Sequence, residues 1–332
     1  MKDMRLPLGV LRSKTAIDNA SLPNSILSRE QSDRFIDMVV DTSTLLKRVR
    51  VERVSNKSGE VNKLDLAEIV TEGANTTSRA TTRTPTEKVM TYDCEKFRSA
   101  FDITSDFEED NIEGAAIRDK LMQMFTKRIS IDSEIACIQG DDSLSVGDSS
   151  SALNNLLGVN DGWSKILNAE VPAAQQLDAS GAAPSSQLYY DMRRKIPARY
   201  RVAKPNYMWI LPSGPYDKWS LDWSKRETAG GDSALANADS VPPPWGINRM
   251  EVPLMPEDLT YGTAGTDGSK IWLTPPENLV VFFRREITFE FERQPRQDCW
   301  EVTVHFGMDC EVENPELVVM AKNVAMSGAD YA

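Results

Sequence analysis

The sequence has little of what most catalytic and metal sites require. It contains a single histidine, His305, and four cysteines that stand far apart, so the closely spaced ligands of a zinc site are missing. The P-loop and the motifs G-x-G-x-x-G and G-x-S-x-G are also absent from the sequence. We therefore expect no enzymatic activity, no cofactor and no metal site. The cysteines are predicted to be reduced thiols packed as small hydrophobic side chains.

Long apolar runs and an excess of positive charge are missing as well. No segment approaches the ~20 apolar residues of a membrane-spanning helix, and the first residues lack the apolar core of a secretory signal. Thirty-eight basic against fifty acidic residues give a formal charge of −12. A protein that binds nucleic acid tightly needs Lys and Arg to neutralise phosphates. We expect a globular cytoplasmic product for which DNA is at most a weak, non-specific neighbour.

A basic arm and a capped helix are predicted at the N-terminus. Residues 1–27 are basic and lack periodicity, which is typical of an extended arm. Ser28 and Gln31 fit a capping box, so a helix is predicted over residues 28–49. The buried side of this helix should carry five apolar side chains, namely Phe35, Ile36, Val39, Val40 and Leu46.

A long β-hairpin is predicted over residues 50–102. Strand-like alternation over residues 48–52 is followed by a turn at 55–59, and further strands are expected over residues 61–70 and 88–101. The tract between these last two strands is rich in Thr and has no large apolar side chain. Such a tract cannot form a core by itself, so we interpret it as a polar tip that projects from the body.

A very long helix should follow the hairpin. Residues 105–108 form a second capping box, and the carboxylates that follow suit the positive end of a helix dipole. Six apolar residues fall on one predicted helix face, namely Ile117, Leu121, Met124, Ile131, Ile135 and Ile138. Because Gly140 ends the pattern, the helix is predicted over residues 106–139, about 50 Å at ~1.5 Å per residue. Asp141 and Asp142, directly after it, could hold a cation, but a solvated cap explains them better.

The second half of the chain alternates between loop-like and strand-like segments. Residues 141–186 are rich in small polar residues and are predicted to be a loop-rich passage between two domains, with weak signals near residues 153–158. The remaining predictions are a helix over residues 188–198, a buried strand over 206–211, a proline-rich extended stretch over 242–256, and an antiparallel pair of strands over 287–292 and 300–308. Trp209 and Trp300 are expected in the core, and Trp219 and Trp223 on one helix face.

The order of these parts resembles the major capsid proteins of tailed bacteriophages, with the Hong Kong-97-type shell fold. The segments that carry the resemblance are ITSDFEED at residues 103–110, IDSEIA at 131–136, QGD at 139–141, RETAGGD at 226–232, WGI at 245–247, VPLMP at 252–256 and TPPENL at 274–279. The first three are similar to the family's spine-helix segment, the next three to its axial-domain segment, and the last to the return into the peripheral domain. The resemblance extends over about residues 25–325.

The resemblance implies an α+β fold in seven parts. They are an N-terminal arm at 1–27, an N-terminal helix at 28–49, an extended β-hairpin (E-loop) at 50–102, the spine helix with the first peripheral part at 103–150, the axial domain at 151–272, the peripheral return strands at 273–325 and a tail at 326–332. It further implies hexamers and pentamers of an icosahedral shell around double-stranded DNA, assembled in the host bacterial cytoplasm. The implied partners are other copies, a portal protein, and optionally a cementing protein. Only a short arm precedes the first helix, so scaffolding is expected from another chain, or is not needed.

Two oppositely charged groups are the expected contacts between copies. Arg79 and Arg83 lie in the polar tip, and Glu108, Glu109 and Asp110 lie at the start of the long helix. The tip cannot be buried on its own subunit, so it should dock on a neighbour, where the acidic helix start offers a matching surface. Two other readings remain open: an encapsulin-type compartment, which shares this fold, and a hydrolase using carboxylates of the loop-rich middle.

Overall fold

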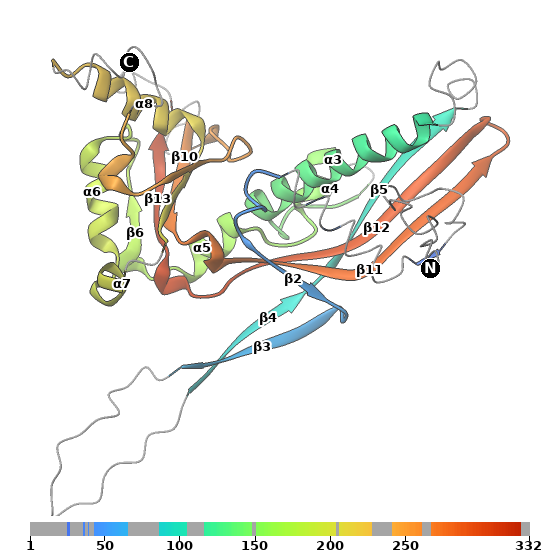
Figure 1. The fold of residues 1–332 in the computed structure, drawn as a ribbon, viewed down its shortest axis with the longest axis horizontal. Coiled ribbons are helices and arrows are strands. Elements are labelled where there is room, and N and C mark those ends of the chain that lie inside the picture. The colour runs from blue at the N-terminus through green and yellow to red at the C-terminus, as the bar shows by residue number, and fades with distance from the viewer. Residues whose placement is uncertain are drawn as a thin grey trace, which may run out of the picture.

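Two bodies of mixed helix and sheet lie side by side, and a two-stranded hairpin projects from between them (Figure 1). The computed structural model describes residues 25–26, 36, 39, 43–65, 86–104, 116–147, 151–203, 206–227, 241–260 and 267–326. Within these ranges, no helix has the length and apolarity needed to cross a membrane. The observed mixture of helix and sheet agrees with the predicted α+β class.

The first body is built on a long antiparallel pair of strands, β11 (Leu279–Gln294) and β12 (Cys299–Val312). Their ladder runs from Leu279 opposite Val312 to Gln294 opposite Cys299, which confirms the strand pair predicted from period-two alternation. The sheet has the order β1-β11-β12-β5, and β2 pairs in parallel with β11. The added strands are β1 (Ser25–Ile26), β2 (Arg50–Val54) and β5 (Glu95–Thr104).

Helix α3 (Ala116–Gln139) lies along this sheet and ends at the predicted residue. Its buried face differs from the predicted one, because Met124 is 66% exposed and Ile131 is also exposed. Ile138 is buried as predicted, and the other buried residues of the helix are Thr126, Ile129, Ser130, Ser133, Glu134, Ala136 and Cys137. Apolar spacing alone therefore missed most of the buried face, since four of these positions are polar. Residues 105–115, the expected start of the helix, lie outside the described residues.

The carboxylate of Glu134 explains why a polar side of α3 is buried. Glu134 is 1% exposed, and its Oε1 accepts hydrogen bonds from Thr44 Oγ1 at 2.8 Å and from the Leu45 amide at 3.3 Å. Its Oε2 accepts from the Thr44 amide at 3.1 Å and from the Ser43 hydroxyl. Ser130 adds a bond to the carbonyl of Val39. These bonds fix the chain that leads into β2 against the helix.

The second body contains a six-stranded sheet with the order β6-β13-β10-β7-β8, in which β9 pairs with β10. Its strands are β6 (Gln176–Asp178), β7 (Met208–Leu211), β8 (Arg249–Glu251), β9 (Leu259–Thr260), β10 (Asp267–Thr274) and β13 (Val319–Ala325). Helices α6 (Ser186–Lys195) and α8 (Ser213–Ser224) pack on it through Tyr189, whose ring meets those of Trp209 and Trp219 edge-on at 5.0 and 5.5 Å. Helix α7 (Ala198–Ala203) follows α6.

Two local predictions need correction. The predicted loop-rich passage at residues 141–186 also contains regular elements, namely α4 (Ala152–Leu157), α5 (Trp163–Glu170), the 3₁₀ turn η2 (Ala173–Gln175) and β6. A small polar residue caps α4, because the Ser151 hydroxyl accepts a hydrogen bond from the Asn154 amide. Helix α5 packs on the core through Trp163 and Leu167, which are both buried. The predicted N-terminal helix does not continue to residue 49, since residues 44–49 form bends and turns.

Other predictions hold or need smaller changes. Ile36, Val39 and Leu46 are buried, and so are all four cysteines, which are unpaired. Trp209 is buried as predicted, whereas Trp300 is only partly buried. The proline-rich stretch contains a 3₁₀ turn, η4 (Pro244–Gly246), and similar turns, η5 (Pro276–Asn278) and η6 (Pro315–Leu317), flank the β11–β12 pair.

Replacing the buried carboxylate tests its structural role. We expect E134A to lower the free energy of unfolding by about 3 kcal/mol or more, because several donors lose their only acceptor in the interior. The control is E52A, which removes an exposed partner of Arg50 and should cost about 1 kcal/mol or less. Urea unfolding of the dispersed subunit measures both. Equal losses in the two variants would show that Glu134 does not anchor the chain.

Candidate interaction surface

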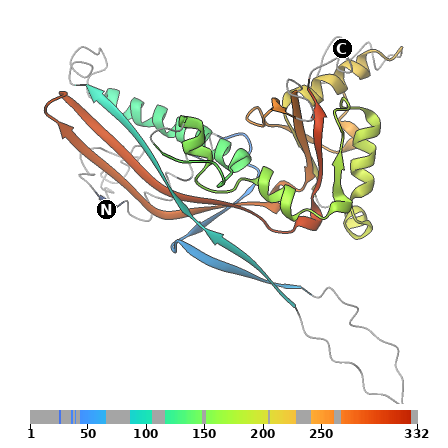
Figure 2. The ribbon, with the colours of Figure 1, turned by 180° about the vertical axis from the view of Figure 1, so that it is seen from behind.

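The hairpin of β3 (Ser58–Asp65) and β4 (Thr86–Asp93) forms a sheet of its own that points away from both bodies (Figures 1 and 2). Its ladder runs from Ser58 opposite Asp93 to Asp65 opposite Thr86. This is less than the predicted 50–102 piece, since β2 and β5 on either side belong to the sheet of β11 and β12. The predicted strand at 88–101 is likewise two strands, interrupted at Cys94.

Only the base of the hairpin has a core. The Tyr92 ring stacks on Phe282 with centroids 4.6 Å apart, and Val61 and Met90 pack against the buried group of Cys94, Val280 and Phe282. Farther out, Val89 is 49% exposed. The hairpin thus has one face packed on the body at its base, whereas Glu60, Val89 and Thr91 on the alternate face are exposed.

Polar contacts tie the same base to β12. The carboxylate of Asp309 accepts hydrogen bonds from the amides of Asp93 at 2.7 Å and Cys310 at 2.9 Å. Glu313 binds the guanidinium of Arg50 at 2.6 Å and also the ammonium of Lys63 in β3. These bonds fix the direction in which the hairpin leaves the body.

A carboxylate-rich cleft of about 670 Å³ lies between the hairpin and the body, lined in part by Glu170, Glu311 and Glu313. Burial, together with the nearby carboxylates of Asp309 and Glu170, raises the pKa of Glu311 to about 8. Burial also raises the pKa of Asp309 to about 6, against the lowering effect of its two amide bonds. Glu170 shows a raised pKa for the same reason, burial. Protonation of Glu170, Asp309 and Glu311 therefore stabilises this side of the hairpin base.

The predicted contact residues Arg79, Arg83, Glu108, Glu109 and Asp110 all lie outside the described residues. The assignment of opposite charges to these two groups stays a prediction. The contacts at the hairpin base were not found from the sequence. Asp309, Glu311 and Glu313 looked like ordinary polar positions of a strand end, and no local pattern distinguished them.

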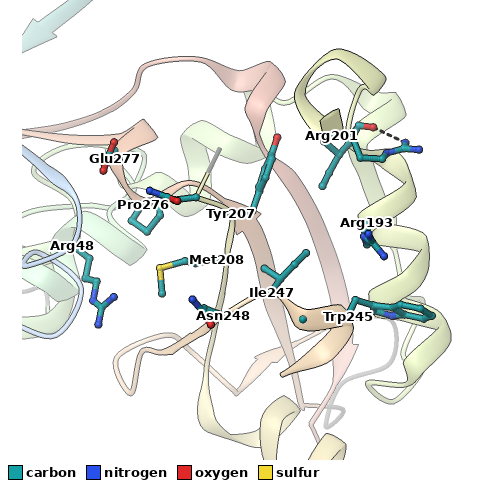
Figure 3. Close-up of a pocket in the computed structure, with 13 residues that line it drawn as sticks. Arg48, Arg193, Arg201, Tyr207, Met208, Trp245, Ile247, Asn248, Pro276 and Glu277 are labelled. Carbon is teal, nitrogen blue, oxygen red and sulfur yellow. Dashed lines mark hydrogen bonds between the residues drawn. The ribbon is translucent and has the colours of Figure 1, made fainter. Parts of the chain in front are cut away.

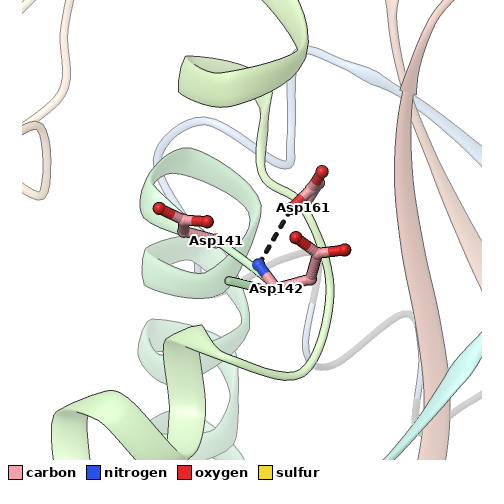
Figure 4. A group of neighbouring side chains, drawn as sticks. All are labelled: Asp141, Asp142 and Asp161. Carbon is pink, nitrogen blue, oxygen red and sulfur yellow. Dashed lines mark hydrogen bonds between the residues drawn. The ribbon is translucent and has the colours of Figure 1, made fainter. Parts of the chain in front are cut away.

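Three aspartates form the tightest acidic group among the described residues, Asp141, Asp142 and Asp161 (Figure 4). The ammonium of Lys165 lies between them, at 2.9 Å from Asp141 and 2.7 Å from Asp161, and it also pairs with Asp142. Hydrogen bonds from Ser143 and Lys165 lower the pKa of Asp141 to about 2. Because Lys165 already supplies the positive charge, this group is a structural ion cluster that joins the end of α3 to α5.

The raised pKa of Glu311 predicts a pH dependence of stability. Between its ordinary value of 4.5 and about 8, the folded subunit holds a proton that the unfolded chain has lost, so this contribution is present at low pH and is lost as the pH rises through about 8. E311Q should therefore raise the midpoint temperature at about pH 9 and have a smaller effect at about pH 5. Thermal unfolding at both pH values measures this, with E60Q on the exposed hairpin face as control. A pH-independent difference for E311Q would contradict it.

Comparisons with known proteins agree on one kind of protein. No family model matches the chain. A curated relative, the Bacillus subtilis (strain 168) prophage capsid protein YqbE, is 24% identical over 321 residues, which cover 93% of this chain and 97% of that protein. The fold is also that of a chain in the satellite phage P4 procapsid, with a TM-score of 0.69 at 16% identity over 94% of this chain and 96% of that one.

Further solved structures have the same fold. A capsid chain of the empty GTA particle gives a TM-score of 0.58 at 15% identity over 86% of this chain and 90% of that one. A chain of Mycobacterium phage Adephagia gives 0.51 at 14% identity, over 84% and 89%. The curated relative is named a capsid protein, and two of these structures are named as a procapsid and a capsid. The chain is therefore similar over nearly its whole length to a prophage capsid protein, and it shares its fold with capsid and procapsid chains of phage-like particles.

Proposed function

We propose that this chain is the major head protein of a tailed phage, which tiles an icosahedral shell as hexamers and pentamers around double-stranded DNA. The observation that carries the proposal is the projecting β3–β4 hairpin. It is held at its base by packing and ion pairs, and farther out Glu60, Val89 and Thr91 are exposed, Val89 by 49%. A second copy is the natural cover, because closed rings of identical subunits repeat each contact and leave no hairpin unused.

The tip of the hairpin would dock on the neighbour through charge. In this proposal Arg79 and Arg83 of one copy meet Glu108, Glu109 and Asp110 at the start of the long helix of the next. Each exposed ion pair contributes only ~0.2–1 kcal/mol, so single contacts stay reversible and wrongly placed subunits can leave. Repetition around a ring makes the sum large enough to hold the shell together.

Other partners follow from the same proposal. A portal protein would occupy one vertex, a separate scaffolding chain could guide assembly, and a cementing protein could bind outside. The formal charge of −12 gives the shell little attraction for phosphates, so packaged DNA is a weak, non-specific neighbour. Assembly would take place in the cytoplasm of the host bacterium, and the finished protein would reside in the virion.

Electron microscopy of the expressed chain tests the proposed function. We expect closed particles whose reconstruction contains both five-fold and six-fold rings of this subunit. Particles recovered from a phage-producing culture should contain double-stranded DNA, whereas an encapsulin-type compartment would contain a cargo protein. A protein that remains a compact monomer at every concentration and salt condition, with or without the products of neighbouring genes, would contradict the proposal.

Charge reversal at the tip tests the proposed contact. The double variant R79E/R83E should fold as the unchanged chain does but form at least about tenfold fewer particles, because attraction to carboxylates becomes repulsion. The matched variant R79K/R83K keeps the charge and should assemble. Particle yield by sedimentation and folding by circular dichroism measure the two effects separately. Normal assembly of R79E/R83E would rule out this contact.

A further inference from the structure

A groove of about 550 Å³ lies at the β7–β8 edge of the six-stranded sheet (Figure 3). Its floor is apolar and includes Met208, Ile247 and Trp245. Guanidinium groups border it on both sides, that of Arg48 from the turn before β2 on one side and those of Arg193 and Arg201, from α6 and α7, on the other. We call it the basic groove, since Glu277 is the only acidic residue among those that line it.

Trp245 is held in an unusual way in this groove. Its φ of 56° and the φ of 71° at Gly246 place two successive residues in the left-handed region, which costs a non-glycine residue about 1–3 kcal/mol. The indole is nevertheless 45% exposed. It is positioned by Tyr190, with ring centroids 5.1 Å apart, and by the guanidinium of Arg193 at 5.9 Å. A strained backbone that presents a large exposed ring is typical of a binding surface.

Several donors of the groove lack acceptors within the described residues. Neither Arg48 nor Arg193 has an ion-pair partner there, and the buried hydroxyl of Tyr207 has no hydrogen-bond partner. Burial and the neighbouring Tyr200 raise the pKa of Tyr207 to about 12, so this hydroxyl remains protonated. Arg201 differs, because it donates to the carbonyls of Arg194 and Ile196. A ligand with anionic acceptors would satisfy the remaining donors.

We propose that the basic groove binds the carboxylates of an acidic segment from a neighbouring copy of this chain. This rests on the proposed self-assembly. Planar guanidinium groups pair with carboxylates through two parallel bonds, and the apolar floor suits the aliphatic or aromatic part of such a segment. The chain carries fifty acidic against thirty-eight basic residues, so a neighbouring copy offers an excess of carboxylates. The same charge repels a nucleic acid, and two guanidinium groups are too few to follow a phosphate backbone.

Zero-length crosslinking identifies the partner group directly. The variants R48K and R193K keep the charge and place an amine in the groove, which carbodiimide joins to a carboxylate in contact with it. Shells are assembled from a mixture of ¹⁴N- and ¹⁵N-labelled subunits, so mass spectrometry separates bonds between copies from bonds within one. We expect peptides that join position 48 or 193 of one copy to an Asp or Glu of another. Bonds to Glu277 of the same copy only, or no bond in well-formed shells, would overturn the proposal.

Protection of Trp245 from oxidation is an independent test of whether the groove is covered in the shell. Its oxidation by hydroxyl radicals should fall by about tenfold or more from dispersed subunits to empty shells, because a buried ring is shielded. Equal oxidation in both states would overturn the proposal. Protection that requires packaged DNA would overturn it in favour of nucleic acid. If the unchanged chain formed no particles, the proposed function itself would fail, a result distinct from particles that lack the crosslink.

Charge reversal completes the test. R48E/R193E should lower the particle yield by about tenfold, since the groove would repel the segment it now attracts. The control K225E/R296E makes the same change of charge at two exposed residues outside the groove. Both variants are first checked for unchanged circular dichroism. An equal loss in the two variants would assign the effect to net charge, and no loss in R48E/R193E would equally contradict the proposal.

Discussion

The antiparallel pairing of β11 with β12 is the constraint on which the subunit depends. These two strands form a nearly continuous ladder, and all other strands of the first sheet attach to one or the other. Because β2 and β5 sit on opposite sides of this pair, the chain between them must leave the sheet and return to it. The β3–β4 hairpin is that excursion. Its direction is therefore set by the strand ladder and by the few residues at its base.

Those few residues combine apolar and ionic contacts. Stacking of Tyr92 on Phe282 packs the end of β4 against β11, while Asp309 binds the amide of Asp93 and Glu313 binds Lys63. The carboxylates beside them carry raised pKa values because they are buried near one another. A rigid base with an uncovered outer face is a suitable arrangement for contact between copies, since a rigid element loses little conformational entropy when it binds.

The two bodies present different surfaces to a neighbour. The first exposes two apolar side chains of α3, Met124 and Ile131. The second presents the basic groove with its exposed Trp245. The guanidinium groups of this groove form a positively charged site on a chain whose formal net charge is −12. Apolar contacts and local charge pairing could thus act together when copies meet, and local pairing also fixes their register.

Residue order alone predicted the mixed helix and sheet fold and several of its main elements. The alternation over residues 287–308 predicted the β11–β12 pair, and the spacing of residues before Gly140 predicted the end of α3. These features are local, because period and capping depend on residues only a few positions apart.

Tertiary structure alone decided which face of α3 is buried and which charges meet. Glu134 is buried because Ser43 and Thr44, far away in the chain, supply its donors, and no periodicity can reveal such a partner. Lys165 likewise turns three separate aspartates into one ion cluster. Arg48 and Arg193 border one groove only after both bodies have folded. Local patterns carry information on backbone form, whereas the pairing of buried and charged groups depends on distances that exist only in the folded chain.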